Sequence, residues 1–276
     1  MRMRFKRDHV GYIELEKLPI KDRKEINVLH SATFLLRGKR YYFKEVKVIN
    51  QSYNEMIGYE LAKDFGLEAI PYDLASYNGR IGFLSRDYMQ EGYVSLEDLL
   101  KQYYGTEEGK NNLDNVSIML RDTFPSEVAE KIINDLLELL MFDIIIGNYD
   151  RHEKNIVIDT KNGKLGPVSD NEMMLDSDAM YGQWYAFKMH PDDKYTLDSF
   201  LGYLDSAGLV TFAKKVLIIE SSNIQSVMSR VEEKIGHPMN EYIKAEIAKK
   251  YSEYFGFLLR KIDKEVEARY TLTKSR

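Results

Sequence analysis

The chain has 276 residues, of which 44% are hydrophobic and 30% are charged, so it can bury a sizeable core and is not globally disordered. Its 39 basic and 44 acidic side chains give a net charge of −5, which argues against a protein that works mainly by gripping nucleic-acid phosphates. Cysteine is absent, which excludes disulfide scaffolds, thiolate nucleophiles and cysteine-bound zinc.

The first third of the sequence has the pattern of two strand pairs. Residues 32–37 and 40–48 are rich in aromatic and β-branched side chains and flank a turn that contains glycine. Residues 72–77 and 80–89 repeat this arrangement around a second turn with an Asn-Gly pair. We therefore expect a small sheet in this part of the chain.

Between these strand pairs, residues 50–65 are expected to form a helix. Ser52 is the expected N-cap, and Gly66 marks the end of the helix. Ser52 and Glu55 also have the spacing of a capping box, in which Glu55 would only bond the backbone at Ser52. This local role for Glu55 is the alternative to a functional one.

The sequence becomes predominantly helical after about residue 91. Ser95 and Ser126 each begin a helix, and the second helix is long, with apolar side chains at helical spacing. A short β-hairpin is expected within residues 156–168, and a long charged helix at residues 240–268.

Together these patterns predict an α+β protein in two lobes. Residues 1–91 would form a small sheet-rich N-terminal lobe, and residues 92–276 a larger helical C-terminal lobe. The most apolar segment, residues 136–146, is interrupted by charged side chains, so no membrane span is expected. Residues 1–17 contain no apolar run typical of a secretory signal, and we expect a cytoplasmic protein.

The densest polar cluster in the chain is GNYDRHEKN, residues 147–155. It follows the apolar end of a long helix and precedes a short strand, which predicts a loop held at both ends, where function tends to lie. Asp150 and Asn155 have the D-x-x-x-x-N spacing of base and metal ligand in a kinase catalytic loop. Asp170 follows at the end of the predicted hairpin.

Phosphoryl transfer requires these residue types. One carboxylate orients the attacking hydroxyl and accepts its proton, while an amide and a second carboxylate hold Mg²⁺, which prefers oxygen ligands. A hairpin between Asn155 and Asp170 would bring both metal ligands to one end of the same strand pair. A hydrolytic metal site without nucleotide is the alternative, but the five histidines are scattered and form no H-x-x-x-H pair.

A kinase also needs a lysine for the α- and β-phosphates and a helical glutamate to pair with it. Lys44 lies mid-strand among apolar neighbours, and Glu55 lies near the start of the following helix. The structural alternatives are that Lys44 is an edge-strand charge and that Glu55 is a capping residue. Both residues taken together with the Asp150 loop favour the phosphate-binding interpretation.

These motifs resemble those of a known family. The catalytic core of HipA-like serine/threonine kinases has roughly the pattern G-N-x-D-R-H-x-x-N and then P-x-x-D, which is similar to GNYDRHEKN and PVSDNE here. The αC helix of that family is similar to NEMIGYELAKDFGLEAIP. The short chain resembles the compact, CtkA-type members, which lack the extra N-terminal subdomain of HipA. Phosphoinositide lipid kinases share the D-R-H loop.

The resemblance implies a two-lobed protein-kinase-like fold that binds ATP and Mg²⁺ between its lobes and transfers the γ-phosphate to a serine or threonine of a protein. It implies that Asp150 is the catalytic base and that Asn155 and Asp170 are the Mg²⁺ ligands. Further residues would bind the nucleotide or brace the catalytic loop: Lys44 with its ion-pair partner Glu55, the adenine-binding hinge of Arg86, Asp87, Tyr88 and Met89 through Gln90, and the bracing residues Arg151 and His152.

The chain departs from the family in the phosphate-binding loop that precedes the lysine strand. The corresponding residues 25–33 contain no glycine, although glycine normally lets backbone N–H groups approach phosphates. Either His30 and Ser31 bind ATP through their side chains, or the loop is displaced and nucleotide binding is weak. Members of the family autophosphorylate in this loop, which makes Ser31 and Thr33 candidate sites.

The sequence does not name the acceptor. The resemblance suggests a toxin that acts on a translation enzyme and is paired with a DNA-binding antitoxin, or a secreted effector, and direct nucleic-acid binding by this chain is not expected. The aromatic-rich residues 180–187 are the candidate platform for a protein substrate, with core packing as the alternative. The rival functions are a small-molecule or lipid kinase of related fold and a nucleotide-binding pseudokinase or interaction module.

Overall fold

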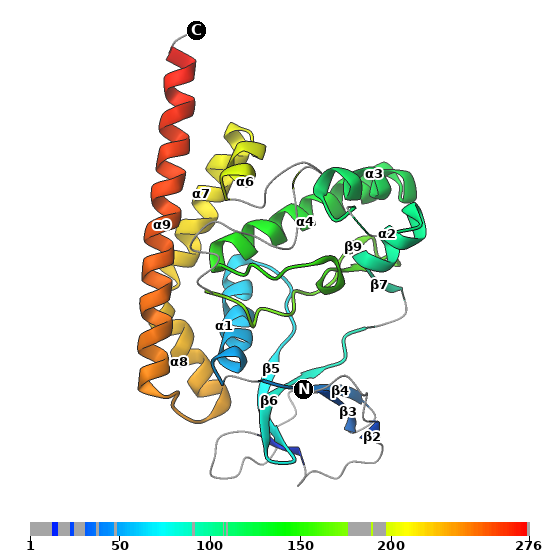
Figure 1. Ribbon diagram of the computed structural model, residues 1–276, viewed down its shortest axis with the longest axis vertical. Coiled ribbons are helices and arrows are strands. Elements are labelled where there is room, and N and C mark those ends of the chain that lie inside the picture. The colour runs from blue at the N-terminus through cyan, green and yellow to red at the C-terminus, as the bar shows by residue number, and fades with distance from the viewer. Residues whose placement is uncertain are drawn as a thin grey trace.

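The computed structural model describes residues 13–15, 23–24, 31–36, 39–46, 49–89, 92–106, 108, 110–175, 189 and 197–274. Strands dominate the first third of these residues and helices the remainder, so the predicted α+β class is confirmed. In Figure 1 the strands of the first third lie at one end of the molecule, and the helices occupy the rest of it. His30, Gln90 and the aromatic-rich residues 180–187 lie outside the described residues.

A six-stranded sheet has the strand order β1-β5-β6-β4-β3-β2. Its strands are β1 (Ile13–Glu14), β2 (Arg23–Lys24), β3 (Ser31–Leu36), β4 (Lys39–Glu45), β5 (Tyr72–Tyr77) and β6 (Arg80–Arg86). β1 and β5 are parallel, and the other neighbours are antiparallel. The two predicted hairpins, β3–β4 and β5–β6, are therefore confirmed.

The β5–β6 hairpin shows how the local sequence fixes the register. Asn78 and Gly79 have φ values of 50° and 72°, the left-handed conformations that a tight two-residue turn requires. The prediction that this second strand reaches residue 89 is wrong, because β6 ends at Arg86. Beyond it, the N–H of Met89 bonds the Asp87 side chain at 3.0 Å instead of a neighbouring strand.

One face of the sheet has its own small core. Phe34 and Phe43 contact Tyr77 edge to face, with ring centroids 5.0 and 5.8 Å apart, and all three side chains are buried. Aromatic side chains from three strands thus interlock on this face. The second core is larger, and it joins β5 and β6 residues such as Tyr72 and Phe83 to apolar side chains of the helices.

Helix α1 (Ile49–Phe65) connects the sheet to the helices. It begins three residues before Ser52, so the prediction that Ser52 is the N-cap is wrong, and Ser52 lies inside the helix. Ser52 and Glu55 are both completely buried. The packing of this face against the rest of the protein, and not a local cap, determines their environment.

The helices predicted at Ser95, at Ser126 and at residues 240–268 are present as α2 (Leu96–Tyr104), α4 (Ser126–Ile146) and α9 (Glu241–Lys274). The remainder of this part, for which the sequence predicts only helical character, contains α3 (Leu113–Thr123), α6 (Leu197–Tyr203), α7 (Ser206–Ser221) and α8 (Ile224–Ile235). Ser95 caps α2 by accepting the Asp98 N–H at 3.0 Å. The predicted hairpin is formed by β8 (Val157–Asp159) and β9 (Lys164–Leu165), and β7 (Tyr93–Ser95) pairs with β8.

The long helix α9 runs along one side of the molecule, and its C-terminal end projects beyond the other helices (Figure 1). Helix α8 packs between it and α1. Among the described residues, no helix combines the length and the apolar character that crossing a bilayer would require.

Charged contacts attach α8 to α1. Arg230 of α8 donates from Nε to Glu60 Oε2 at 3.3 Å and from a terminal nitrogen to Asp64 Oδ2 at 2.5 Å. Lys234, one turn later, donates to the Tyr72 carbonyl on β5. These contacts hold α8 against both α1 and the sheet.

We predict that Arg230→Ala lowers the free energy of unfolding by about 1–2 kcal/mol, because Glu60 is buried and loses a charged hydrogen-bond partner. Urea denaturation measures this loss. Lys249→Ala is the control, since Lys249 is exposed and lies 3.9 Å from Glu253, and its effect should stay within about 0.5 kcal/mol. Equal effects of the two substitutions would contradict the role given to Arg230.

Candidate active site

The loop that contains Asp150 begins where α4 ends. Gly147 adopts the left-handed conformation with φ 66°, and its N–H bonds the carbonyls of Asp143 and Ile144, which terminates the helix. The chain then continues through Asn148 to a single 3-10 turn, η2 (Glu153–Asn155), before it enters β8. The polar cluster is therefore held between a long buried helix and a strand, as the sequence predicted.

A buried ion pair lies beneath this loop. Arg151 is 2% exposed, and it donates from Nε to Asp143 Oδ2 at 2.9 Å and from a terminal nitrogen to Asp143 Oδ1 at 3.0 Å. Asn148 also donates to Asp143, at 3.0 Å. Burial raises the pKa of the Asp143 carboxyl, and the opposing Arg151 charge and its hydrogen bonds favour the ionised form.

The same arginine reaches the loop that carries Asp170. Its other terminal nitrogen donates to the carbonyl of Ser169, and the terminal nitrogen that contacts Asp143 also donates to Asn171 Oδ1 at 2.9 Å. Asn148 Nδ2 lies 3.3 Å from the carbonyl of Asp170. Arg151 and Asn148 therefore fasten the Asp150 loop and the Asp170 loop to each other around one buried carboxylate.

Asp170 has a strained backbone conformation. Its φ is 59°, a value that non-glycine residues seldom adopt. Its N–H donates to the hydroxyl of Tyr72 at 3.1 Å, while its carbonyl accepts from Asn148. These contacts on both sides of the residue hold the peptide in place, and such strain is often found at functional positions.

Asp150 is half-buried, and none of the described residues donates a hydrogen bond to its carboxylate. Burial raises its pKa, as does the charge of Asp170, whereas His152 and Lys44 lower it. An unpaired carboxylate with a raised pKa is suited to accept a proton.

Asn155 is oriented by its neighbours in the same loop. Its Nδ2 lies 3.4 Å from the Asp150 carbonyl and 3.3 Å from His152 Nε2. Because the amide nitrogen makes both of these contacts, Oδ1 is the side-chain atom that remains to bind a ligand. His152 thereby supports Asn155, and its own Nδ1 is buried without a partner in the described structure.

Lys44 of β4 meets two carboxylates. Its Nζ lies 3.3 Å from Asp170 Oδ1 and 3.0 Å from Glu172 Oε2. Burial by itself would lower the pKa of Lys44, but Asp170, Glu172 and Glu55 together raise it, so the ammonium stays charged. Sequence reasoning missed Glu172, although the residue lies in the PVSDNE segment, because nothing in the local pattern shows that it faces β4.

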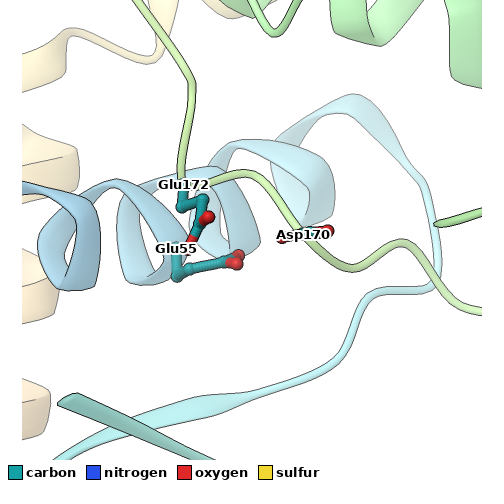
Figure 2. A group of neighbouring side chains, drawn as sticks. All are labelled: Glu55, Asp170 and Glu172. Atoms are coloured by element: carbon teal, nitrogen blue, oxygen red, sulfur yellow. The ribbon is translucent and has the colours of Figure 1, made fainter. Parts of the chain in front are cut away.

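Glu55 lies on α1 beside this cluster, and Figure 2 shows its carboxylate turned toward Asp170 with Glu172 close by. The structure departs from the expected Lys44–Glu55 ion pair: within the described residues no such contact of 4.0 Å or less occurs. Glu55 Oε2 instead accepts the N–H of Asn171 at 2.8 Å. It therefore is not a capping residue for Ser52 either. Burial raises the pKa of Glu55 to about 8, helped by the charge of Asp170.

Helix α1 is packed tightly on the loop that follows Asp170. Asn54 donates to the carbonyls of Glu172 and Met174 at 2.9 and 3.0 Å. A Cβ at Gly58 would lie 2.6 Å from Asn171 Cβ, so only glycine permits this approach. The position of the loop is thus determined jointly by α1 and by Arg151.

The expected hinge follows β6. Arg86 is the last residue of β6, and Asp87, Tyr88 and Met89 form a segment without regular secondary structure. The N–H of Asp87 bonds the Arg40 carbonyl at 2.8 Å, and that of Met89 bonds Asp87 Oδ1. An adenine ring would have to displace the latter contact to use the Met89 N–H. The Tyr88 hydroxyl lies 3.4 Å from Ser169 Oγ, which brings the hinge close to the Asp170 loop.

Only the end of the glycine-free loop is described. Ser31 and Thr33 belong to β3, where Ser31 is the backbone neighbour of Lys44 and Thr33 that of Tyr42. The described end of this segment therefore lies next to Lys44 in the sheet. Thr33 Oγ1 is buried and has no partner among the described residues, so phosphorylation at this position would require β3 to move.

The donor set fits a hard divalent cation. Glu55, Asp170 and Glu172 each offer an oxygen, and these atoms lie within 4.8 Å of one another. Asn155 Oδ1, in the Asp150 loop, is the further oxygen ligand that the sequence predicts. Oxygen donors without histidine or sulfur suit Mg²⁺ better than zinc.

This combination of an antiparallel sheet, a helix with a buried glutamate and a D-x-x-x-x-N loop facing a second acidic loop defines a kinase-like fold. Neither a family model nor a curated protein sequence matches the chain. Many solved structures resemble it, among them the following two. The Helicobacter pylori proinflammatory kinase CtkA is 17% identical, with a TM-score of 0.64 over 87% of this chain and 95% of its own.

The second is HipA from the Shewanella oneidensis MR-1 toxin–antitoxin complex with HipB and operator DNA. It is 15% identical, with a TM-score of 0.51 over 90% of this chain and 67% of its own. At these identities the comparisons show the fold. The predicted resemblance to a compact, CtkA-type HipA-like kinase is confirmed at that level.

We predict that Asp143→Ala destabilises the protein by about 3–5 kcal/mol, because it leaves the buried Arg151 guanidinium without its counter-ion. The double variant Asp143→Ala with Arg151→Met should recover part of this loss, since it removes the uncompensated charge. Chemical denaturation of the two single variants and the double variant measures the coupling. Additive losses would show that the two side chains do not stabilise each other.

The raised pKa of Glu55 also predicts a pH dependence of stability. Between pH 4.5, the ordinary value, and about 8, the folded protein holds a proton on Glu55 that the unfolded chain has released. Each pH unit in this range therefore lowers the free energy of unfolding by up to about 1.4 kcal/mol. Asp170, Glu172, Lys44 and Tyr72 face this carboxyl and contribute to its environment.

Glu55→Gln keeps an oxygen that can accept the Asn171 N–H but cannot ionise. We expect its stability relative to the wild type to increase as the pH rises from 5 to 8, measured by urea denaturation in metal-free buffer at about one-unit intervals. A constant difference across this range would mean that Glu55 is ionised in the folded protein.

Proposed function

We propose that this protein is an ATP- and Mg²⁺-dependent kinase that transfers the γ-phosphate to a serine or threonine hydroxyl of a protein substrate. The observation that carries the proposal is the buried Arg151, whose contacts to Asp143, Ser169 and Asn171 fasten the Asp150 loop to the Asp170 loop. Phosphoryl transfer depends mainly on positioning and charge stabilisation, and a rigid link between these two loops supplies positioning.

Asp150 is the proposed base. Its carboxylate is half-buried and lacks a hydrogen-bond donor from the described residues, so an incoming hydroxyl can occupy that position. The carboxylate would orient the hydroxyl toward the γ-phosphate and take its proton as the new P–O bond forms. Its raised pKa favours proton acceptance.

Asp170 and Asn155 are the proposed Mg²⁺ ligands, and ATP would supply the transferred phosphoryl group. The metal ion, when bound, neutralises the charge that develops on the phosphate oxygens. Asn155 contributes Oδ1 because its nitrogen is held by His152 and the Asp150 carbonyl. Lys44 would contact the α- and β-phosphates once Asp170 is engaged by the metal.

The proposed lobes are residues 1–91 and 92–276. The six-stranded sheet lies within the first range and most of the helices within the second, which supports this division. Nucleotide would bind between them, with the hinge at residues 86–90 beside the adenine. The partner could be a DNA-binding antitoxin, since the HipA neighbour comes from a complex with HipB. We also propose a cytoplasmic location.

The test is incubation of the purified protein with Mg²⁺ and γ-labelled ATP, together with protein, lipid and metabolite acceptors. We predict that Asp150→Asn lowers the transfer rate about 10²-fold or more, because general-base catalysis is lost. Asp170→Ala should abolish transfer, because it removes a metal ligand. Asp198→Asn is the control, since Asp198 is exposed on α6 and pairs with Lys261.

Label transferred only to a lipid or metabolite would identify a small-molecule or lipid kinase of this fold. Binding of ATP without transfer to any acceptor would indicate a pseudokinase. Near-normal transfer by Asp150→Asn would contradict the role given to Asp150.

A further inference from the structure

Lys44 has two carboxylate partners in this structure, and we expect nucleotide binding to change its contact with one of them and not with the other. Asp170 is the proposed metal ligand, so its oxygens would turn to the cation. Glu172 Oε2, at 3.0 Å from Lys44 Nζ, is the nearer contact of the two. Glu172 therefore remains to hold the ammonium once Asp170 has left it.

The backbone of Glu172 is fixed independently of Lys44. Its carbonyl accepts a hydrogen bond from Asn54 of α1 at 2.9 Å. The side chain is 17% exposed, and the side chain of Lys44 is 42% exposed, so the pair lies at the edge of the protein interior and is accessible to a ligand. A short, partly desolvated ion pair of this kind restricts the direction in which a lysine points.

Glu55 contacts the backbone next to Glu172 instead of Lys44. Its Oε2 accepts the N–H of Asn171, the residue before Glu172, at 2.8 Å. Gly58, one turn later on α1, allows the close approach of Asn171. Glu55 thus holds the backbone that presents Glu172, and within the described residues it forms no ion pair with Lys44.

We propose that Glu172 is the positioning residue that orients Lys44 toward the nucleotide phosphates, and that Glu55 supports it through the Asn171 backbone. This inference rests on the proposed kinase function. The ordinary alternative is that Glu172 is a further metal ligand, since its carboxylate lies within 4.8 Å of those of Asp170 and Glu55.

The experiment measures binding of adenylyl imidodiphosphate, a nonhydrolysable ATP analogue, by calorimetry at a Mg²⁺ concentration that saturates the wild type. The variants are Glu172→Gln, Lys44→Met and the two combined. Glu45→Gln is the matched control, because it removes a carboxylate from the residue next to Lys44 that pairs with Arg80 at 3.2 Å. Thermal unfolding of each variant reports on its folding.

We expect Glu172→Gln to weaken binding about tenfold in the wild-type background and less than about twofold in the Lys44→Met background, since without Lys44 there is nothing to orient. Glu172→Asp, which keeps the charge, should recover part of the affinity. Glu45→Gln should bind as the wild type does. A tenfold increase in Mg²⁺ should leave the Glu172→Gln defect unchanged.

Four results would overturn the inference. An equal loss in both backgrounds would show that Glu172 acts independently of Lys44, and recovery at high Mg²⁺ would make it a metal ligand. Unchanged binding by Glu172→Gln would remove its role while leaving the proposed function intact, provided that the wild type transfers label from ATP. A wild type that neither binds the analogue nor transfers label would overturn the proposed function together with this inference.

Discussion

The site depends on a single buried charge pair. Asp143 lies in the last turns of α4, and Arg151 lies in the loop that follows. The Arg151 side chain folds back onto Asp143, so that one carboxylate joins the helix to the loop. A buried guanidinium must satisfy its remaining donors, and Arg151 does so on Ser169 and Asn171. The need to pair one charge away from water thereby places the two acidic loops side by side.

Helix α1 provides the second constraint. On one side of α1, Arg230 of α8 bonds the helix's acidic residues. On its other side, α1 contacts the Asp170 loop through Asn54, Glu55 and Gly58. A displacement of α1 would have to break contacts on both sides. The acidic loop is consequently held between a helix and an arginine, which accounts for the strained backbone at Asp170.

The electrostatics of the site follow from this crowding. Three carboxylates lie within 4.8 Å of one another with one lysine beside them. Burial and like charge raise the pKa of Glu55 to about 8, while Lys44 stays charged because its acidic neighbours outweigh its burial. The three carboxylates would accommodate the positive charge of a divalent cation, and Lys44 would accommodate the negative charge of a polyphosphate.

The sequence by itself determined the elements whose signals are local: the hairpins, the Ser95 cap, the long apolar helix α4 and the D-x-x-x-x-N spacing, since turn geometry, capping and periodicity act over a few residues. It misplaced the start of α1, because Ser52 is a good cap by composition but lies on a face that tertiary packing buries. Only the tertiary structure decided that Lys44 meets Glu172 and that Glu55 bonds Asn171. Those residues are separated by more than a hundred positions, and nothing local fixes which carboxylate a distant lysine contacts. The packing of α1 between α8 and the Asp170 loop settles that choice.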